Sequence, residues 1–118
     1  PDTDFTKIGK GSLGGKARGL AFMSTRMKNS PEFHEKFKNI SIAVPKTVVV
    51  STDGFDAFIS DNDLGEVATG DYNDSEIIRL FTRARMPEML EQNLKRYLKH
   101  ARYPLAVRSS SLLEDAQF

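Results

Sequence analysis

The stretch IGKGSLGGKARGL, from Ile8 to Leu20, determines how the N-terminal part of this chain folds. It places five glycines and three basic residues in thirteen positions, which favours a flexible loop over its first half. From residue 13 to residue 27 the apolar side chains recur at steps of three and four, which predicts a helix that begins at Gly14 or Gly15. The sequence Asn-Ser-Pro at 29–31 predicts the end of that helix.

A glycine-rich loop that leads into a helix is an arrangement that binds anions. The first amides of a helix have no acceptor within the helix, and the helix dipole places positive charge at the same end. Lys16 adds an ammonium group in the first turn, directly after Gly14 and Gly15. These three residues form a candidate phosphate site. A plain glycine-rich connection with a solvated lysine is the alternative interpretation.

Two common phosphate motifs do not fit this loop. Gly9, Gly11 and Gly14 satisfy G-x-G-x-x-G by letter, but a dinucleotide-binding fold needs an acidic residue about 20 residues further on, at the end of the second strand. Here the second strand ends near Asp53, nearly twice as far away. A Walker A loop fails as well, because Ala17 stands where its Mg²⁺-binding hydroxyl should be.

Local patterns divide the rest of the chain into helices and short strands. The β-branched run that ends at Thr52 is the best strand, and its Ser-Thr-Asp ending is typical of a helix cap. We expect an α+β fold of mixed α/β character, in which helices cover a small sheet. The expected elements are strands at 5–8, 44–52 and 104–110, and helices at 14–28, 31–40, 53–62, 75–85 (capped by Asn73 or Asp74) and 87–101.

Length and composition favour one soluble domain over residues 1–118. The chain has 39% hydrophobic and 28% charged residues, a net charge of +1 and no cysteine. The lack of cysteine excludes disulfides and thiolate metal sites and suits a cytoplasmic location. No apolar run approaches the roughly 20 residues that span a bilayer, so we expect no membrane partner. The chain stops at Phe118 without a closing element, so we expect a fragment of a longer protein.

Arg108 is the second candidate for anion binding. It ends the apolar stretch PLAV, where a guanidinium that has lost much of its water needs an anionic partner. A phosphate held by two hydrogen bonds would serve, with Ser109 beside it, and Glu114 or Asp115 is the alternative partner. If the fold brings Arg108 to Lys16, both side chains can hold one polyphosphate.

Charge is unevenly distributed along the chain. Residues 53–76 contain eight acidic and no basic side chains, whereas residues 79–108 contain eight basic and two acidic ones. Compensation between neighbouring surfaces accounts for this pattern. A non-catalytic module that binds nucleotide or nucleic acid through the basic helix at 87–102 stays an alternative, with tyrosines interleaved among Lys95, Arg96, Lys99 and Arg102.

Three blocks of sequence together resemble the N-terminal nucleotide-binding domain of the phosphoenolpyruvate synthase and pyruvate phosphate dikinase family. They are LGGKARGLAFM, VPKTVVVSTDGFDAFI and PLAVRSSSLLED, in the family's order and over nearly the whole chain. The resemblance implies the first part of an ATP-grasp-like domain, in which Lys16 and Arg108 bind the ATP phosphates. Gly14, Gly15 and Ser109 belong to the same two motifs and complete the candidate site.

The resemblance also implies a reaction. The whole enzyme would be an ATP-dependent phosphotransferase that uses ATP and Mg²⁺ to phosphorylate a carrier histidine on a separate domain, and then pyruvate, giving phosphoenolpyruvate and AMP. Neither His34 nor His100 lies in a carrier motif, and the metal carboxylates are expected after Phe118. We therefore expect this chain alone to be inactive and to bind Mg-ATP weakly. Arg18 departs from the family loop, and its role is open.

Overall fold

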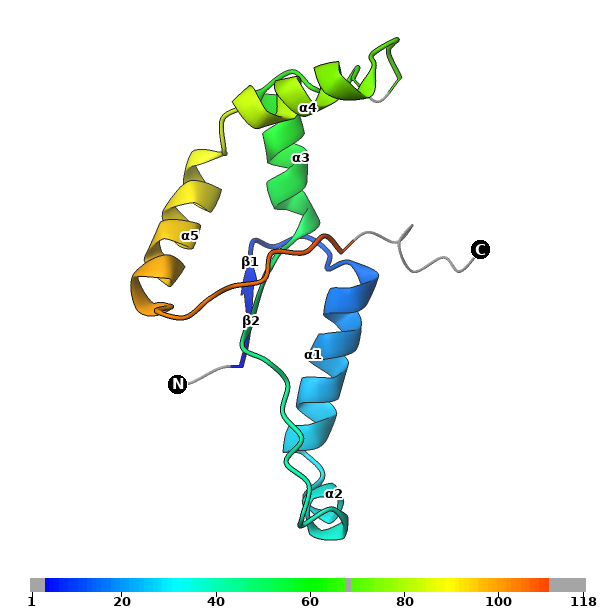
Figure 1. The fold of residues 1–118 in the computed structure, drawn as a ribbon, viewed down its shortest axis with the longest axis vertical. Helices are drawn as coiled ribbons and strands as arrows, with labels where there is room; N and C mark the ends of the chain where they lie inside the picture. Colours follow the sequence, from blue (N-terminus) through cyan, green and yellow to red (C-terminus); the bar gives the residue numbers. More distant parts are fainter. Residues whose placement is uncertain (1–3, 68, 111–118) are drawn as a thin grey trace.

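Two short parallel strands form the sheet of this protein. The structure, a computed structural model, describes residues 4–67 and 69–110. Strand β1 (Phe5–Ile8) pairs with strand β2 (Thr47–Val50), residue by residue along their whole length. Parallel strands cannot be joined by a tight turn. Here helices α1 (Gly15–Lys28) and α2 (Pro31–Lys36) lie in the connection between them (Figure 1).

Both strands predicted in the first half of the chain are confirmed, and the second is shorter than predicted. β2 covers Thr47–Val50 rather than residues 44–52, because β1 offers only four residues for pairing. One further backbone hydrogen bond extends the ladder at each end. Thr47 N–H donates to the Asp4 carbonyl (2.8 Å), and Ser51 N–H donates to the Ile8 carbonyl (3.0 Å). The second of these bonds fixes the position of the turn that follows β2.

The bounds of the first two helices follow the sequence pattern. Gly14 is the N-cap of α1 and Asn29 is its C-cap, which confirms the predicted helix to within a residue. Pro31 is the first residue of α2, where its missing N–H leaves no hydrogen bond unmade. α2 ends at Lys36, four residues earlier than predicted.

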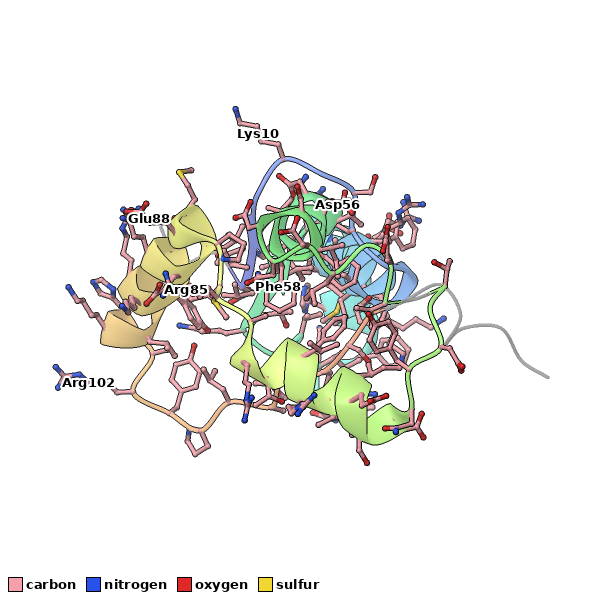
Figure 2. The ribbon with its side chains drawn as sticks, turned by 90° about the horizontal axis from the view of Figure 1, so that it is seen from above. Lys10, Asp56, Phe58, Arg85, Glu88 and Arg102 are labelled. Atoms are coloured by element: carbon pink, nitrogen blue, oxygen red, sulfur yellow. The ribbon has the colours of Figure 1, made fainter. Side chains whose placement is uncertain are left out.

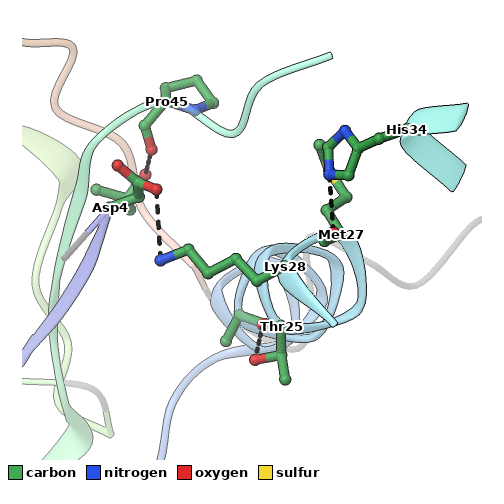
Figure 3. A network of polar contacts seen from close by, with 8 residues as sticks. Asp4, Thr25, Met27, Lys28, His34 and Pro45 are labelled. Carbon is green, nitrogen blue, oxygen red and sulfur yellow. Dashed lines mark hydrogen bonds and ion pairs between the residues drawn. The ribbon is translucent and has the colours of Figure 1, made fainter. Parts of the chain in front are cut away.

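Figure 3 shows one contact within this connection and one between it and the residue before β1. The ring Nε2 of His34 lies 3.0 Å from the Met27 carbonyl and joins α2 to the end of α1. Lys28 Nζ lies 3.4 Å from the carboxylate of Asp4, just before β1. Both partners of this ion pair are well exposed, so it contributes at most about 1 kcal/mol to stability.

Between β2 and residue 110, the described chain forms three further helices, namely α3 (Thr52–Asp61), α4 (Asp74–Arg83) and α5 (Glu88–His100). The predicted cap of α4 is confirmed, because Asn73 and Glu76 exchange side-chain to backbone hydrogen bonds of 3.0 Å. Pro87 occupies the N-cap position of α5 rather than its first turn. In Figure 1, α1 and α5 lie on opposite sides of the two strands. The predicted mixed α+β class is confirmed.

Asn62, the C-cap residue of α3, joins the helices of the second half of the chain. Its side-chain amide donates to the Arg85 carbonyl and accepts from the Arg85 N–H, both at 2.8 Å, and it also donates to the Phe58 carbonyl at 2.8 Å. The side chain therefore pairs with the backbone between α4 and α5 much as a neighbouring strand would. The rings of Phe58 and Phe81 pack beside it with centroids 5.8 Å apart.

The buried core of the described residues is small. Its apolar side chains are Ala17, Leu64 and Val67, whereas Phe22 and Met89 are 66% and 75% exposed. The radius of gyration is 17.8 Å, compared with about 13 Å for a compact domain of about 100 residues. Figure 1 shows the cause, since α3 and α4 extend away from the strands. No helix in the described ranges is long and apolar enough to cross a membrane.

The strand predicted at 104–110 is wrong. This segment has no regular structure in the described part of the chain, and Val107 is 95% exposed. An apolar run becomes a strand only where a neighbour satisfies its backbone, and the sheet contains β1 and β2 alone among the described residues. Arg108 is exposed too, so its guanidinium has kept its access to water.

The double hydrogen bond between Asn62 and the Arg85 backbone leads to the first prediction. Asn62→Asp replaces the donating amide group by a carboxylate that faces two carbonyls, so it should lower the free energy of unfolding by about 1–3 kcal/mol. Asn93→Asp is the matched control, because the Asn93 side chain donates to the Met89 carbonyl within its own helix rather than joining two segments. Urea denaturation followed by circular dichroism measures both variants. Equal losses in the two variants would contradict this role of Asn62.

Candidate functional site

The first half of the glycine-rich loop is bound to the turn between β2 and α3. Lys10 N–H donates to Asp53 Oδ2 (2.9 Å), and Ser12 N–H donates to Thr52 Oγ1 (3.1 Å). In return, Thr52 N–H donates to the Ser12 carbonyl (2.9 Å). The sequence predicted a flexible loop with free backbone amides. For Lys10 and Ser12 this is wrong, because the turn after β2 supplies acceptors for both.

Two glycines of this loop are required where the loop meets the turn after β2. Gly9 has φ of +102°, and a Cβ at this position would lie against Ser51 Oγ and 2.6 Å from Asp53 Oδ1. A Cβ on Gly11 would lie 2.8 Å from the Asp53 amide nitrogen. The positive φ of Gly9, and the short distance from a Gly11 Cβ to a backbone atom, both disfavour a side chain at these positions. The glycines therefore serve the contact with α3, in addition to any ligand contact.

Ser51 connects the end of β1 to the start of α3. It is only 1% exposed, and it is the most buried of the described side chains. Its Oγ lies 2.9 Å from the Ile8 carbonyl and also contacts Asp53 Oδ1. A hydroxyl has one proton to donate, and the ionised carboxylate is the stronger acceptor. The Ile8 carbonyl still accepts from the Ser51 amide, so both acceptors are satisfied.

The carboxylate of Asp53 is surrounded by donors. The Ser51 hydroxyl, followed by the backbone amides of Lys10 and Gly11, holds the pKa of Asp53 well below its usual range. The side chain is exposed to solvent, so this shift comes from hydrogen bonding and is only weakly opposed by desolvation. Asp53 is therefore an anion under all ordinary conditions, and it is bound by the loop that the sequence proposed for an external anion.

The second half of the loop meets the C-terminal segment of the described chain. Ala17 N–H, one of the first amides of α1 without an acceptor in the helix, donates to Ser110 Oγ (3.3 Å). A Cβ on Gly14 would overlap the Ser110 carbonyl, so the two backbones are in direct contact. Two residues of extended chain span about 7 Å. The backbone of Arg108 therefore lies close to the start of α1, although its sequence position is far away.

The predicted site residues thus fall into two adjoining segments. Gly14, Gly15 and half-buried Lys16 form the start of α1, and Arg108 and Ser109 lie beside it through Ser110. Lys16 and Ser109 each take part in a contact within the protein. Arg108 is exposed, so the expectation that its guanidinium has lost much of its water is wrong. The alternative partners Glu114 and Asp115 lie outside the described residues.

Sequence reasoning missed the role of Ser51 and Asp53. It identified the Ser-Thr-Asp sequence as a helix cap, and Ser51 does stand at the N-cap of α3, but its side chain makes no capping bond. The hydroxyl instead binds the Asp53 carboxylate and lies beside the Ile8 carbonyl of β1. A pattern in the sequence could have predicted that the loop binds Asp53. The glycine-rich loop follows one strand and offers backbone amides, and a carboxylate follows the neighbouring parallel strand.

Metal ligands do not gather at this site. Residues 4–67 and 69–110 contain no group of three or more histidine, aspartate or glutamate side chains that could hold a metal ion. His34 and His100 are both exposed, and each bonds to a backbone carbonyl of a nearby residue. The start of α1 offers amides and cationic side chains, which suit an anion rather than a cation.

Fold and site together define a mixed α/β domain with a glycine-rich loop in front of its first helix, which binds the carboxylate of Asp53. The family of pyruvate phosphate dikinase AMP/ATP-binding domains matches residues 10–118, and the chain belongs to this family. The match begins inside the glycine-rich loop and includes β2, the turn with Asp53 and the segment around Arg108. The predicted family is confirmed. Comparisons with curated proteins and with solved structures gave no match.

The donors around Asp53 lead to the second prediction. An aspartate in an unfolded chain is half protonated near pH 3.9, whereas Asp53 should stay ionised well below that pH. Its contribution to stability is present above about pH 4 and is lost as the pH falls toward the lower pKa of the folded state. The carboxyl ¹³C shift of Asp53, followed by NMR from pH 7 to pH 2, measures this directly.

The Ser51→Ala variant is the control for this titration. The Ser51 hydroxyl is the largest cause of the shift, so its removal should move the midpoint of Asp53 back toward its usual value. A wild-type midpoint near pH 3.9, or a midpoint that Ser51→Ala leaves unchanged, would contradict the geometry described above.

Proposed function

We propose that this chain is the ATP-binding portion of a phosphoenolpyruvate synthase-like phosphotransferase. The whole enzyme would convert ATP and pyruvate to phosphoenolpyruvate and AMP, through a phosphohistidine carried on a separate domain and with water or phosphate as the second acceptor. Membership of the AMP/ATP-binding family supports the proposal that the ligand is a nucleotide. The single observation that carries the site is the contact of Ser110 with Gly14 and Ala17, which joins the two segments that bear Lys16 and Arg108.

The chemistry proposed for these residues is electrostatic. A transferred phosphoryl group passes through a loose transition state whose charge is spread over its oxygens. The amides of Gly14 and Gly15, the helix dipole and the Lys16 ammonium would neutralise that charge from one side. The Arg108 guanidinium and the Ser109 hydroxyl would approach from the other. An exposed guanidinium is available to a ligand, and it binds a phosphate through two parallel hydrogen bonds.

Magnesium would supply the remaining neutralisation when it accompanies ATP. It takes near-octahedral oxygen ligands, usually one or two carboxylates together with phosphates and water. The residues at the start of α1 do not fit this role, because they offer amide and cationic groups. We propose that the metal carboxylates follow Phe118, in the same ATP-grasp-like domain, and that the protein works in the cytoplasm. Residues 1–118 would form the first part of that domain.

The alternative function, nucleic-acid binding through α5, has weaker support. Lys95 is paired with Glu91 of its own helix at 2.5 Å, so part of the basic charge is compensated. The hydroxyl groups of Tyr97 and Tyr103 lie 3.0 Å apart and bond to each other. Binding through this helix would weaken steeply with salt and would ignore free ATP, so α5 provides the control for the next experiment.

The third prediction tests Lys16. We expect Mg-ATP to shift the amide NMR signals of residues 14–17 with a dissociation constant on the order of 1 mM or weaker, without hydrolysis by this chain. Lys16→Ala should weaken binding about tenfold, because a phosphate loses its cationic partner. Arg96→Ala removes the same charge from α5 and should leave the dissociation constant for Mg-ATP unchanged. Loss of Mg-ATP binding in the Arg96 variant, with full binding in the Lys16 variant, would contradict the proposed phosphate site at the start of α1.

The fourth prediction tests Arg108 in the whole enzyme. Arg108→Lys keeps the charge but removes the planar pair of donors, so it should cost about 2–3 kcal/mol of transition-state stabilisation, seen in kcat/KM for phosphorylation of the carrier histidine from ATP. Folding should be unaffected, since the side chain is exposed. A lowered melting temperature with normal phosphorylation would instead identify Arg108 as one half of a structural ion pair.

A further inference from the structure

Asp53 is a charged side chain to which the proposed function assigns no role. Its hydrogen bonds connect it to the glycine-rich loop, through the Lys10 amide at 2.9 Å and the Gly11 amide, and to Ser51. Figure 2 shows the Lys10 side chain pointing away from the rest of the chain, so the contact is made by the backbone of the loop. Loop and carboxylate are 43 residues apart in sequence. This is a specific tertiary contact rather than a local cap.

Holding the loop has an energetic reason. Glycine loses more conformational freedom on folding than any other residue, and residues 9–15 contain four of them. An unrestrained loop would let the start of α1 fray. The bonds of Lys10 and Ser12 to the α3 turn fix the loop just before Leu13, and thereby fix the direction in which the chain enters α1 at Gly14.

The same contact also decides where an external anion can bind. The Lys10 and Gly11 amides already hold the Asp53 carboxylate, and a second anion there would be repelled by it. At the start of α1, the Ala17 amide donates to the neutral hydroxyl of Ser110. The two halves of the loop therefore differ in charge although both are rich in glycine.

We propose that Asp53 is a positioning residue for nucleotide binding: it holds residues 9–12 of the glycine-rich loop, aims the start of α1, and confines the phosphates to the Gly14–Lys16 half. The proposal rests on the proposed function, since it assumes that a phosphate binds at α1. Asp53 itself does not touch the nucleotide.

Three substitutions separate this role from general effects of charge. Asp53→Ala removes both the acceptors and the charge, so it should release the loop and weaken Mg-ATP binding about tenfold. Asp53→Asn keeps one acceptor oxygen and nearly the same shape, so it should retain binding to within about threefold. Asp56→Ala is the control, because it removes the same charge one turn later on α3, from an exposed residue.

A pair of glycine variants tests the same contact with the carboxylate intact. Gly11→Ala places a Cβ 2.8 Å from the Asp53 amide nitrogen and 2.9 Å from Oδ1, so it should push the loop and Asp53 apart and reproduce the loss seen in Asp53→Ala. Gly19→Ala, in the exposed part of α1, meets no atom within 4 Å and should bind Mg-ATP normally. If Asp53→Ala does not fold, this pair decides the question.

The experiment is an NMR titration of each variant with Mg-ATP, preceded by spectra of the ligand-free proteins. Without ligand, Asp53→Ala should shift the amide signals of residues 14–17 and speed hydrogen exchange at Lys10, while Asp56→Ala should do neither. With Mg-ATP, the order of affinity should be wild type, then Asp53→Asn, then Asp53→Ala. This order is the fifth prediction.

The outcomes distinguish the two proposals. Normal binding and unchanged α1 signals in Asp53→Ala, while the wild type binds Mg-ATP, would overturn the positioning role and leave the proposed function standing. Equal losses in Asp53→Ala and Asp56→Ala would also overturn it, because charge alone would then explain the effect. A wild type whose signals ignore Mg-ATP would contradict the proposed function and this inference with it.

Discussion

The arrangement of the strands, the loop and two helices depends on the hydroxyl and amide of one buried residue, Ser51. Its amide extends the strand ladder to Ile8, and its hydroxyl binds the carboxylate that holds the glycine-rich loop. A larger side chain at this position would collide with Gly9, whose missing Cβ leaves room for the Ser51 oxygen. The contact of Gly9 with the Ser51 side chain therefore sets the positions of β2, the loop and the first turn of α3 together.

A second close approach completes the site from the other end of the described chain. Gly14 lies against the backbone of Ser110, and the amide of Ala17 finds its acceptor there. The start of α1 is thus held from two sides, by the α3 turn before it and by the segment after Arg108. In both contacts a glycine leaves room for another segment of the chain. The loop therefore contains more glycines than one bound phosphate would require.

Most of the local structure could be predicted from the sequence, whereas most of the tertiary contacts could not. The start of α1 at the Gly14–Gly15 pair, the Pro31 start of α2 and the Asn73 cap of α4 are all local patterns, and all are confirmed. The segment 104–110 has the composition of a strand, but pairing depends on a neighbour that composition does not reveal. Asp53 was likewise assigned to a cap, because nothing local shows that a carboxylate will bind amides 43 residues away. The meeting of the two candidate segments was predicted, but from a need of Arg108 for an anion that its exposed position contradicts. The family was predicted from three motifs in order.

The sequence separation of these contacts has a consequence for how the protein folds. Helices α1, α4 and α5 are local structures that form within about a microsecond, whereas contacts across 43 and 93 residues require the closure of long loops. The start of α1 can acquire its final surroundings only after both ends of the chain have been brought together. With so few buried apolar side chains to hold that arrangement, the contact between Ser110 and Ala17 should be among the last to form during folding and the first to open in the native state.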